Sequence, residues 1–183
     1  MRAFFIGLQF LTRLSIIRQD HWTEEDFGRS VKFFPLIGAV LGMIYAAAAY
    51  VFLIFLPSKG IIFPPHTISA VLLILPPLLT GGLHCDGFMD TMDGVFSGRD
   101  REKMLSIMKD SHVGSYAVLA FVFYYLIYWS SAVSIPGDIL PFVLLSCDVA
   151  GKCCSYMQVQ HLPYARPAEE GKAGGVYRRG GLL

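Results

Sequence analysis

Three aspartates follow one another at helical spacing directly after a long apolar stretch. Asp86, Asp90 and Asp93 stand at i, i+4 and i+7, so a helix through them would carry all three carboxylates on one face. Like charges on one stripe repel each other unless a cation lies among them. Carboxylate ligation favours a hard divalent ion, Mg²⁺ or Mn²⁺, commonly shared with substrate phosphates. The pattern therefore predicts phosphoryl-transfer chemistry, the alternative being a solvated segment without a metal.

A group of cations follows the aspartates. Asp100 is placed to cap a short helix that ends near Asp110. Arg99, Arg101 and Lys109 then supply positive charge near the predicted metal, and arginine binds phosphate oxygens in a bidentate manner. The alternative interpretations are topogenic charges for the arginines and a surface ion pair for Lys109 with Asp110.

His84 and the glycines complete the candidate site. His84 is a metal ligand, a general base or a hydrogen-bonded histidine at a helix end, and the sequence leaves these alternatives open. Gly81 and Gly82 are placed to end the apolar segment. Gly87 and Gly94 would let backbone or phosphate approach closely. We count Gly82 and Gly94 among the candidate substrate-binding residues.

The elements that must position these residues are membrane helices. Hydrophobic residues make up 54% of the 183 residues and charged residues only 16%, whereas soluble domains carry about 25% charged residues. We expect an all-α polytopic membrane bundle, with four spanning segments near 33–57, 61–83, 113–135 and 139–160. The prolines of the second segment predict a break or a re-entrant turn. The fourth segment carries Asp148 and Lys152, which we interpret as a structural pair.

The distribution of Lys and Arg predicts the orientation. Five lie in the N-terminal segment, four in 84–112 and five from Lys152 onward, while the two intervening loops hold Lys59 and none. Both termini and the aspartate segment are therefore expected on the cytoplasmic side of the cell's inner membrane. Residues 3–17 predict an interfacial amphipathic helix. The four cysteines are expected to pack without disulfides, and 168–183 to form a disordered tail after a membrane domain over 1–167.

The stretch Gly81–Gly94 resembles the GGLHxDGxxDxxDG signature of the cobalamin-5′-phosphate synthases, also called adenosylcobinamide-GDP ribazoletransferases. Further similarities run over 98–114, over Leu8–Leu14, over Phe33–Gly42 and over Pro163–Pro167, so the resemblance covers about 1–167. Relatives continue further with more membrane helices, so this chain is expected to be a shortened form whose activity is open.

The resemblance implies a Mg²⁺-dependent transferase that joins adenosylcobinamide-GDP to α-ribazole or its 5′-phosphate and releases GMP, with the lipid bilayer as its surroundings and no nucleic-acid partner. A homo-oligomer is left open. The implied roles are carried by the residues already introduced: the metal ligands Asp86, Asp90 and Asp93, the phosphate-binding Arg99 and Arg101, and the catalytic candidates His84, Asp90, Lys109 and Asp110.

Other functions fit less well. A CDP-alcohol phosphotransferase would carry a DGxxAR element. The stretch Asp86–Thr91 has Asp90 and Thr91 in place of its Ala-Arg pair. An aspartate-rich prenyltransferase would carry adjacent aspartates. A transporter or channel would place its acidic residues at the bilayer midplane, where only Asp148 is expected. An inactive or non-catalytic membrane subunit is the remaining alternative.

Overall fold

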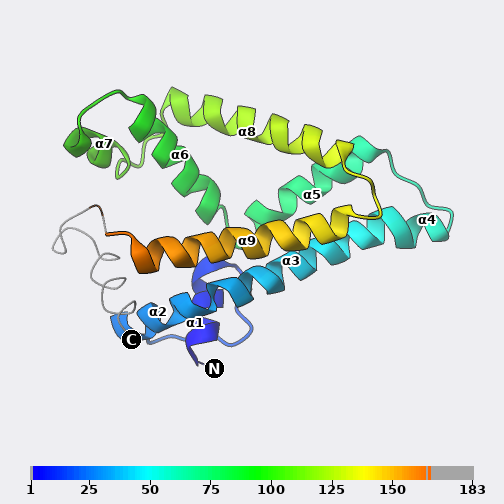
Figure 1. The fold of residues 1–183 in the computed structure, drawn as a ribbon, viewed down its shortest axis with the longest axis horizontal. Coiled ribbons are helices and arrows are strands. Elements are labelled where there is room, and N and C mark those ends of the chain that lie inside the picture. The colour runs from blue at the N-terminus through cyan, green and yellow to red at the C-terminus, as the bar shows by residue number, and fades with distance from the viewer. Residues whose placement is uncertain (1, 164, 166–183) are drawn as a thin grey trace. The chain divides into compact units, whose positions relative to one another are not determined.

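The computed structural model describes residues 2–163 and 165, and within them every regular element is helical. The all-α prediction is thus confirmed for this part of the chain, and the tail expected over 168–183 lies outside it. The chain divides into two compact units, Met1–Lys59 with Gly137–Leu183, and Gly60–Pro136. Figure 1 labels the helices of both.

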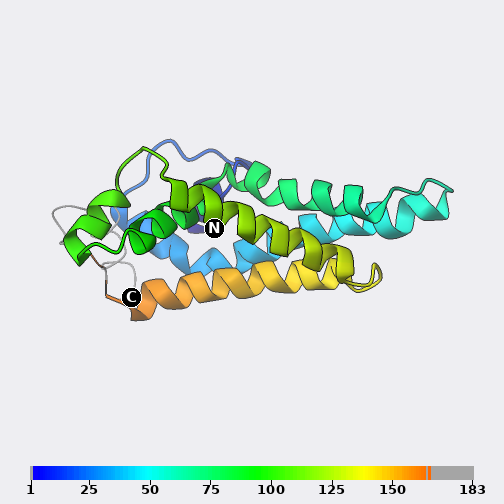
Figure 2. The same cartoon turned by 90° about the horizontal axis from the view of Figure 1, so that it is seen from above.

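The first unit is built around two long helices that pack side by side. These are α3 (Phe34–Tyr50), continued by η2 (Val51–Phe55) and α4 (Leu56–Ser58), and α9 (Leu140–His161). Figures 1 and 2 both show α3 and α9 in contact along their lengths. A Cβ added at Gly38 would lie 2.8 Å from Lys152 Cγ, and one at Gly42 would lie 2.9 Å from Leu145 Cα. Glycine therefore sets how closely the two helices approach, as small residues do in membrane bundles.

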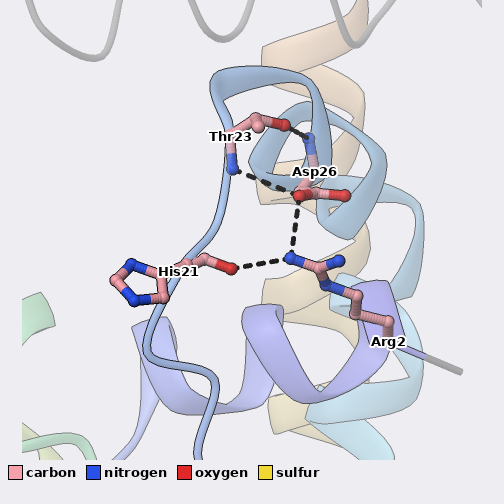
Figure 3. Close-up of polar contacts among 4 residues, drawn as sticks. All are labelled: Arg2, His21, Thr23 and Asp26. Carbon is pink, nitrogen blue, oxygen red and sulfur yellow. Dashed lines mark hydrogen bonds and ion pairs between the residues drawn. The ribbon is translucent and has the colours of Figure 1, made fainter.

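The N-terminal segment folds back onto this unit. It contains α1 (Arg2–Leu11), α2 (Glu24–Ser30) and the 3₁₀ turn η1 (Val31–Phe33). Thr23 and Asp26 form a reciprocal capping box at the start of α2. Arg2 ties α1 to this turn, because its Nη2 donates to the carbonyl of His21 at 2.6 Å and lies 3.3 Å from Asp26 Oδ2 (Figure 3).

A helix forms where the interfacial helix was predicted, but it is shorter than 3–17, and much of its apolar side is covered by protein. Ile6, Leu8 and Leu11 are at most 4% exposed. Phe10 contacts the ring of Phe27 with centroids 4.6 Å apart. The sequence pattern could not distinguish a helix that faces lipid from one that packs on its own chain, because both need one apolar stripe.

The second unit carries the remaining helices: α5 (Pro65–Thr80), α6 (Leu83–Phe96), α7 (Arg101–Ile107) and α8 (Ser115–Ser134). Pro76 and Pro77 lie inside α5 without ending it. The break falls instead at Gly81 and Gly82, whose φ angles of 64° and 79° favour glycine, and α6 leaves α5 at 92°. The expected end of the segment at Gly81–Gly82 is confirmed.

Two helices of the described chain are long and apolar enough to cross a membrane, Glu25–Ser58 and Ser115–Ser134. A third is obtained if the bent pair α5–α6 is one broken span or a re-entrant loop. The fourth expected segment forms α9 at the predicted place, but it is not among these, so a bundle of four spans is not confirmed. All four cysteines are free, as predicted.

Candidate functional site

The helix α6 carries the aspartates, as their spacing predicts. Gly82 occupies the position before its first turn, and the amide of Asp86 donates to the Gly82 carbonyl at 2.9 Å. Thr80 and Gly81 close the preceding helix. Because two consecutive glycines adopt positive φ here, the chain turns sharply and starts a new helix within two residues.

The three carboxylates have different surroundings. Asp86 is exposed, whereas Asp90 and Asp93 are half-buried. Within residues 2–163 and 165, no three His, Cys, Asp or Glu side chains lie close enough together to form a metal site. The helix thus aligns the aspartates on one side without gathering three carboxylates at one point.

Asp93 is engaged with the start of α8. Its Oδ2 accepts the amide of Gly114 at 2.6 Å and its Oδ1 accepts the amide of Ala117 at 2.8 Å. A Cβ at position 114 would lie 2.5 Å from Asp93 Oδ1, so this approach requires glycine. The sequence did not indicate this contact; its one signal is the isolated Gly114 directly before an apolar helix.

The glycines of the motif differ in what lies beside them. A Cβ at Gly94 would lie 2.6 Å from Met108 Cγ and 3.2 Å from Met104 Cγ, so α7 occupies the space next to this glycine. Beside Gly82 and Gly87 no heavy atom lies within 4 Å of the position a Cβ would take. Gly82 and Gly87 are therefore the glycines that leave backbone open to a ligand, and the substrate-binding roles of Gly82 and Gly94 stay predictions.

The cations lie on and around α7. Asp100 caps this helix as predicted, since its carboxylate accepts the amide of Lys103 at 2.9 Å. Arg99, Arg101 and Lys109 are exposed. Arg101 thus lies on α7, Arg99 shortly before it and Lys109 shortly after it. The helix α7 packs against α6 at Gly94.

Asp110, a catalytic candidate, pairs with His112, which sequence reasoning missed. The carboxylate Oδ1 lies 2.6 Å from Nδ1 of His112 and accepts its backbone amide at 3.0 Å. These hydrogen bonds lower the pKa of Asp110, and the hydrogen bond to Asp110 raises the pKa of His112. The i, i+2 spacing in a loop was the available signal.

His84 and Cys85 lie in the first turn of α6. His84 is exposed. Cys85 Sγ lies 3.8 Å from the hydroxyl of Tyr125 on α8, and Phe88 contacts Tyr124 with ring centroids 5.5 Å apart. Tyr124 and Tyr125 of α8 thus pack against α6.

The donor set of α6 fits a magnesium ion in part. Mg²⁺ is commonly held by one or two carboxylates together with water and substrate phosphates, so a cluster of three is not required. Asp86 and Asp90 stand one turn apart on α6 and have no hydrogen bond to the backbone of another helix among the bonds of the described chain. They are the residues that would hold the ion.

Within the described residues the fold is all-helical, and two or three of its helices have the length and apolar character of membrane spans, as in the class of integral membrane proteins. The chain matches the family model described as cobalamin-5-phosphate synthase over residues 3–181. It is 37% identical over 169 residues to the adenosylcobinamide-GDP ribazoletransferase of Desulfitobacterium hafniense (strain Y51), covering 91% of this chain and 64% of the relative. The protein of that name from Acetivibrio thermocellus is 38% identical, covering 92% and 65%.

The chain therefore belongs to the cobalamin-5-phosphate synthase family. It spans just under two thirds of the length of these curated relatives. No solved structure matches it.

Proposed function

We propose that this chain catalyses the transfer named for its relatives, joining adenosylcobinamide-GDP to α-ribazole or its 5′-phosphate, with release of GMP. The observation that carries the proposal is the family match over 3–181, which includes the whole of α6, α7 and the turn between them. The reaction needs residues that hold a diphosphate and one that takes a proton. This segment offers both kinds.

The chemistry balances with the groups at hand. A hydroxyl of ribazole attacks the phosphorus joined to cobinamide, the new P–O bond forms, and the bond from that phosphorus to the oxygen of GMP breaks. The hydroxyl proton passes to His84 or to an aspartate of α6. Arg99, Arg101 and Lys109 bind the phosphate oxygens and offset their charge.

Asp86 and Asp90 would hold Mg²⁺ in this proposal. A bound Mg²⁺ supplies charge neutralisation at the diphosphate. Asp93 already accepts two backbone hydrogen bonds, so the proposal depends on the other two carboxylates. Asp110, which pairs with His112, takes a supporting role by holding the loop that follows α7.

The membrane orientation is part of the same proposal. The excess of Lys and Arg in 84–112 over the loops on either side supports a cytoplasmic position for α6 and α7. A cysteine placed at Lys103 on a cysteine-free background should react with a membrane-impermeant maleimide only in opened cells, whereas one at Lys59 should react in intact spheroplasts. The reverse pattern would contradict this orientation.

The test uses membranes that contain this chain, with adenosylcobinamide-GDP, α-ribazole and Mg²⁺. GMP release and cobalamin formation should occur and should stop when EDTA is added. A relative of full length runs in parallel, and its activity in the absence of any product from this chain would contradict the proposal.

Two variants sharpen the test. Asp90→Asn removes a proposed metal ligand and should lower kcat by about a hundredfold or more. Asp100→Asn is the matched control, because asparagine caps a helix as well as aspartate does and the activity should persist. Equal activity in the two variants would exclude the role assigned to Asp90.

A further inference from the structure

The start of α8 lacks a cap of its own. The residue before its first turn is Gly114, with φ −86° and ψ 167°, which has no side chain to accept the free amides of the turn. The usual solution is an oxygen of the capping residue itself, from Ser, Thr, Asp or Asn. Here both oxygens of Asp93 take that place, from 21 and 24 residues earlier in the chain.

The contact is charged and directional. A carboxylate at a helix N-terminus is favoured by the aligned peptide dipoles as well as by the two hydrogen bonds. It also occupies the amides that a substrate phosphate would otherwise use at a helix start. Phosphate binding is thereby left to the cations of 99–109 and to the open side of α6.

Gly94, the residue after Asp93, packs against a different helix, α7. A Cβ at the buried Gly94 would lie 3.2 Å from Cγ of Met104 on α7 and 2.6 Å from Cγ of Met108, the residue that follows α7. The last two residues of the Gly81–Gly94 motif thus contact two different helices, Asp93 the start of α8 and Gly94 the face of α7.

We propose that Asp93 is a positioning residue that caps α8 from α6, and that its carboxylate serves this contact rather than a metal ion. The metal-ligand role of Asp90, with which Asp93 is contrasted below, rests on the function proposed above. The cap that Asp93 provides for α8 does not. Gly114 is a glycine because any side chain there would meet this carboxylate.

The experiment follows amide exchange in peptides that cover 113–118, with the chain in detergent micelles. Asp93→Ala should speed exchange there by about tenfold or more, because a charged hydrogen-bond acceptor is lost. Gly114→Ser should also speed exchange, since its Cβ would displace Asp93. The double variant Asp93→Ala with Gly114→Ser removes the clash and gives the helix a cap of its own, so exchange should slow again.

Mn²⁺ binding, followed by electron paramagnetic resonance, separates the cap from a ligand role. In the double variant Mn²⁺ affinity should equal that of the unmodified chain, while Asp90→Asn should weaken it. Loss of Mn²⁺ binding in the double variant with exchange restored would make Asp93 a ligand and overturn the proposal. Unchanged exchange in Asp93→Ala would also overturn it.

The proposed function and the capping role of Asp93 can fail independently of each other. If Asp90→Asn binds Mn²⁺ as the unmodified chain does, the metal site assigned to α6 is wrong, yet the exchange results still decide the cap. If Asp93→Ala alone does not fold, the double variant still decides, because the proposal requires that the serine restores folding and protection.

Discussion

Two helix contacts in this protein depend on glycine for different reasons. The α3–α9 seam consists of Gly38 and Gly42 facing Leu145, Asp148 and Lys152, and there glycine admits the backbone and aliphatic atoms of a neighbouring helix. The α6–α8 junction consists of Asp93, Gly114 and Ala117, and there glycine admits a carboxylate that bonds to two amides.

The two contacts are stabilised by different interactions. At the α3–α9 seam the attraction is dispersion between closely packed atoms, so the cost of a substitution should follow the volume added. At the α6–α8 junction the attraction is directional and charged, so the cost should follow the loss of an acceptor, and a new acceptor nearby should restore it. Glycine alone in a sequence does not reveal which of these it serves.

The largest effect on stability is expected at the α3–α9 seam. In Gly38→Ala the new Cβ would lie within 2.9 Å of three atoms, one of them the backbone carbonyl of Asp148, which cannot move without its helix. The free energy of unfolding should fall by about 3 kcal/mol. Urea or dodecyl sulfate unfolding of the chain in micelles, followed by circular dichroism, measures it.

Gly151→Ala is the matched control. Gly151 lies on α9, and no heavy atom lies within 4 Å of the position its Cβ would take, so alanine there should be neutral or stabilise by up to about 1 kcal/mol through helix propensity. Equal stability of the two alanine variants would mean that the α3–α9 seam does not limit the approach of these helices.

Local elements of the fold could be predicted from the sequence because they depend on neighbours along the chain. The helix through Asp86, Asp90 and Asp93 follows from spacing, and the cap at Asp100 follows from one side chain and the amide three residues later. The bend at Gly81–Gly82 follows from the freedom of glycine at positive φ.

The partners of the candidate site could not be predicted in the same way. The hydrogen bonds that Asp93 accepts from the amides of Gly114 and Ala117 depend on how the segment 97–113 returns the chain to α6, and no local pattern encodes that path. For the same reason the proximity of Cys85 to Tyr125, 40 residues apart, could not be predicted. The prolines predicted a break or a re-entrant turn in this segment, and the chain does bend there by 92°, but at Gly81–Gly82 rather than at Pro76 and Pro77.

A smaller effect is expected where α7 packs on α6. Gly94→Ala would bring a Cβ to 2.6 Å from Met108 Cγ, but methionine side chains are flexible and can shift. Gly87→Ala, on the same helix with open space beside it, carries the same gain in helix propensity without the contact. We expect Gly87→Ala to raise stability and Gly94→Ala to lower it, with a difference of about 2 kcal/mol.

Thermal unfolding of the two α6 variants side by side measures that difference. Because the propensity term is common to both, the difference in midpoint reports the packing of α7 alone. A Gly94→Ala variant as stable as Gly87→Ala would show that α7 does not pack tightly on α6, and the orientation of the cations that α7 carries would lose its support.

The smallest effect is expected at the exposed pair Asp110–His112, which involves neither close packing at a glycine nor the capping of a helix. Because the pKa of Asp110 is lowered in the folded state, this carboxylate stabilises the fold above its ordinary pKa of 3.8, and the stabilisation is lost as the pH falls through the lowered pKa. Because the pKa of His112 is raised, its contribution is present below the ordinary value of 6.5 and is lost as the pH rises through the raised pKa. The pair should therefore stabilise the loop chiefly between these two values.

His112→Gln tests this window, because it removes the titrating group and leaves the backbone amide that Asp110 accepts. The unmodified chain should lose a small part of its thermal stability, relative to this variant, as the pH rises above 6.5 through the raised pKa of His112. Added salt should shrink the difference because both side chains are exposed. An identical pH dependence in the two proteins would show that the pair does not hold the loop. The segment between α7 and α8 would then depend on the α6–α8 junction for its position, which makes the exchange of the Gly114 and Ala117 amides the more direct measure of its order.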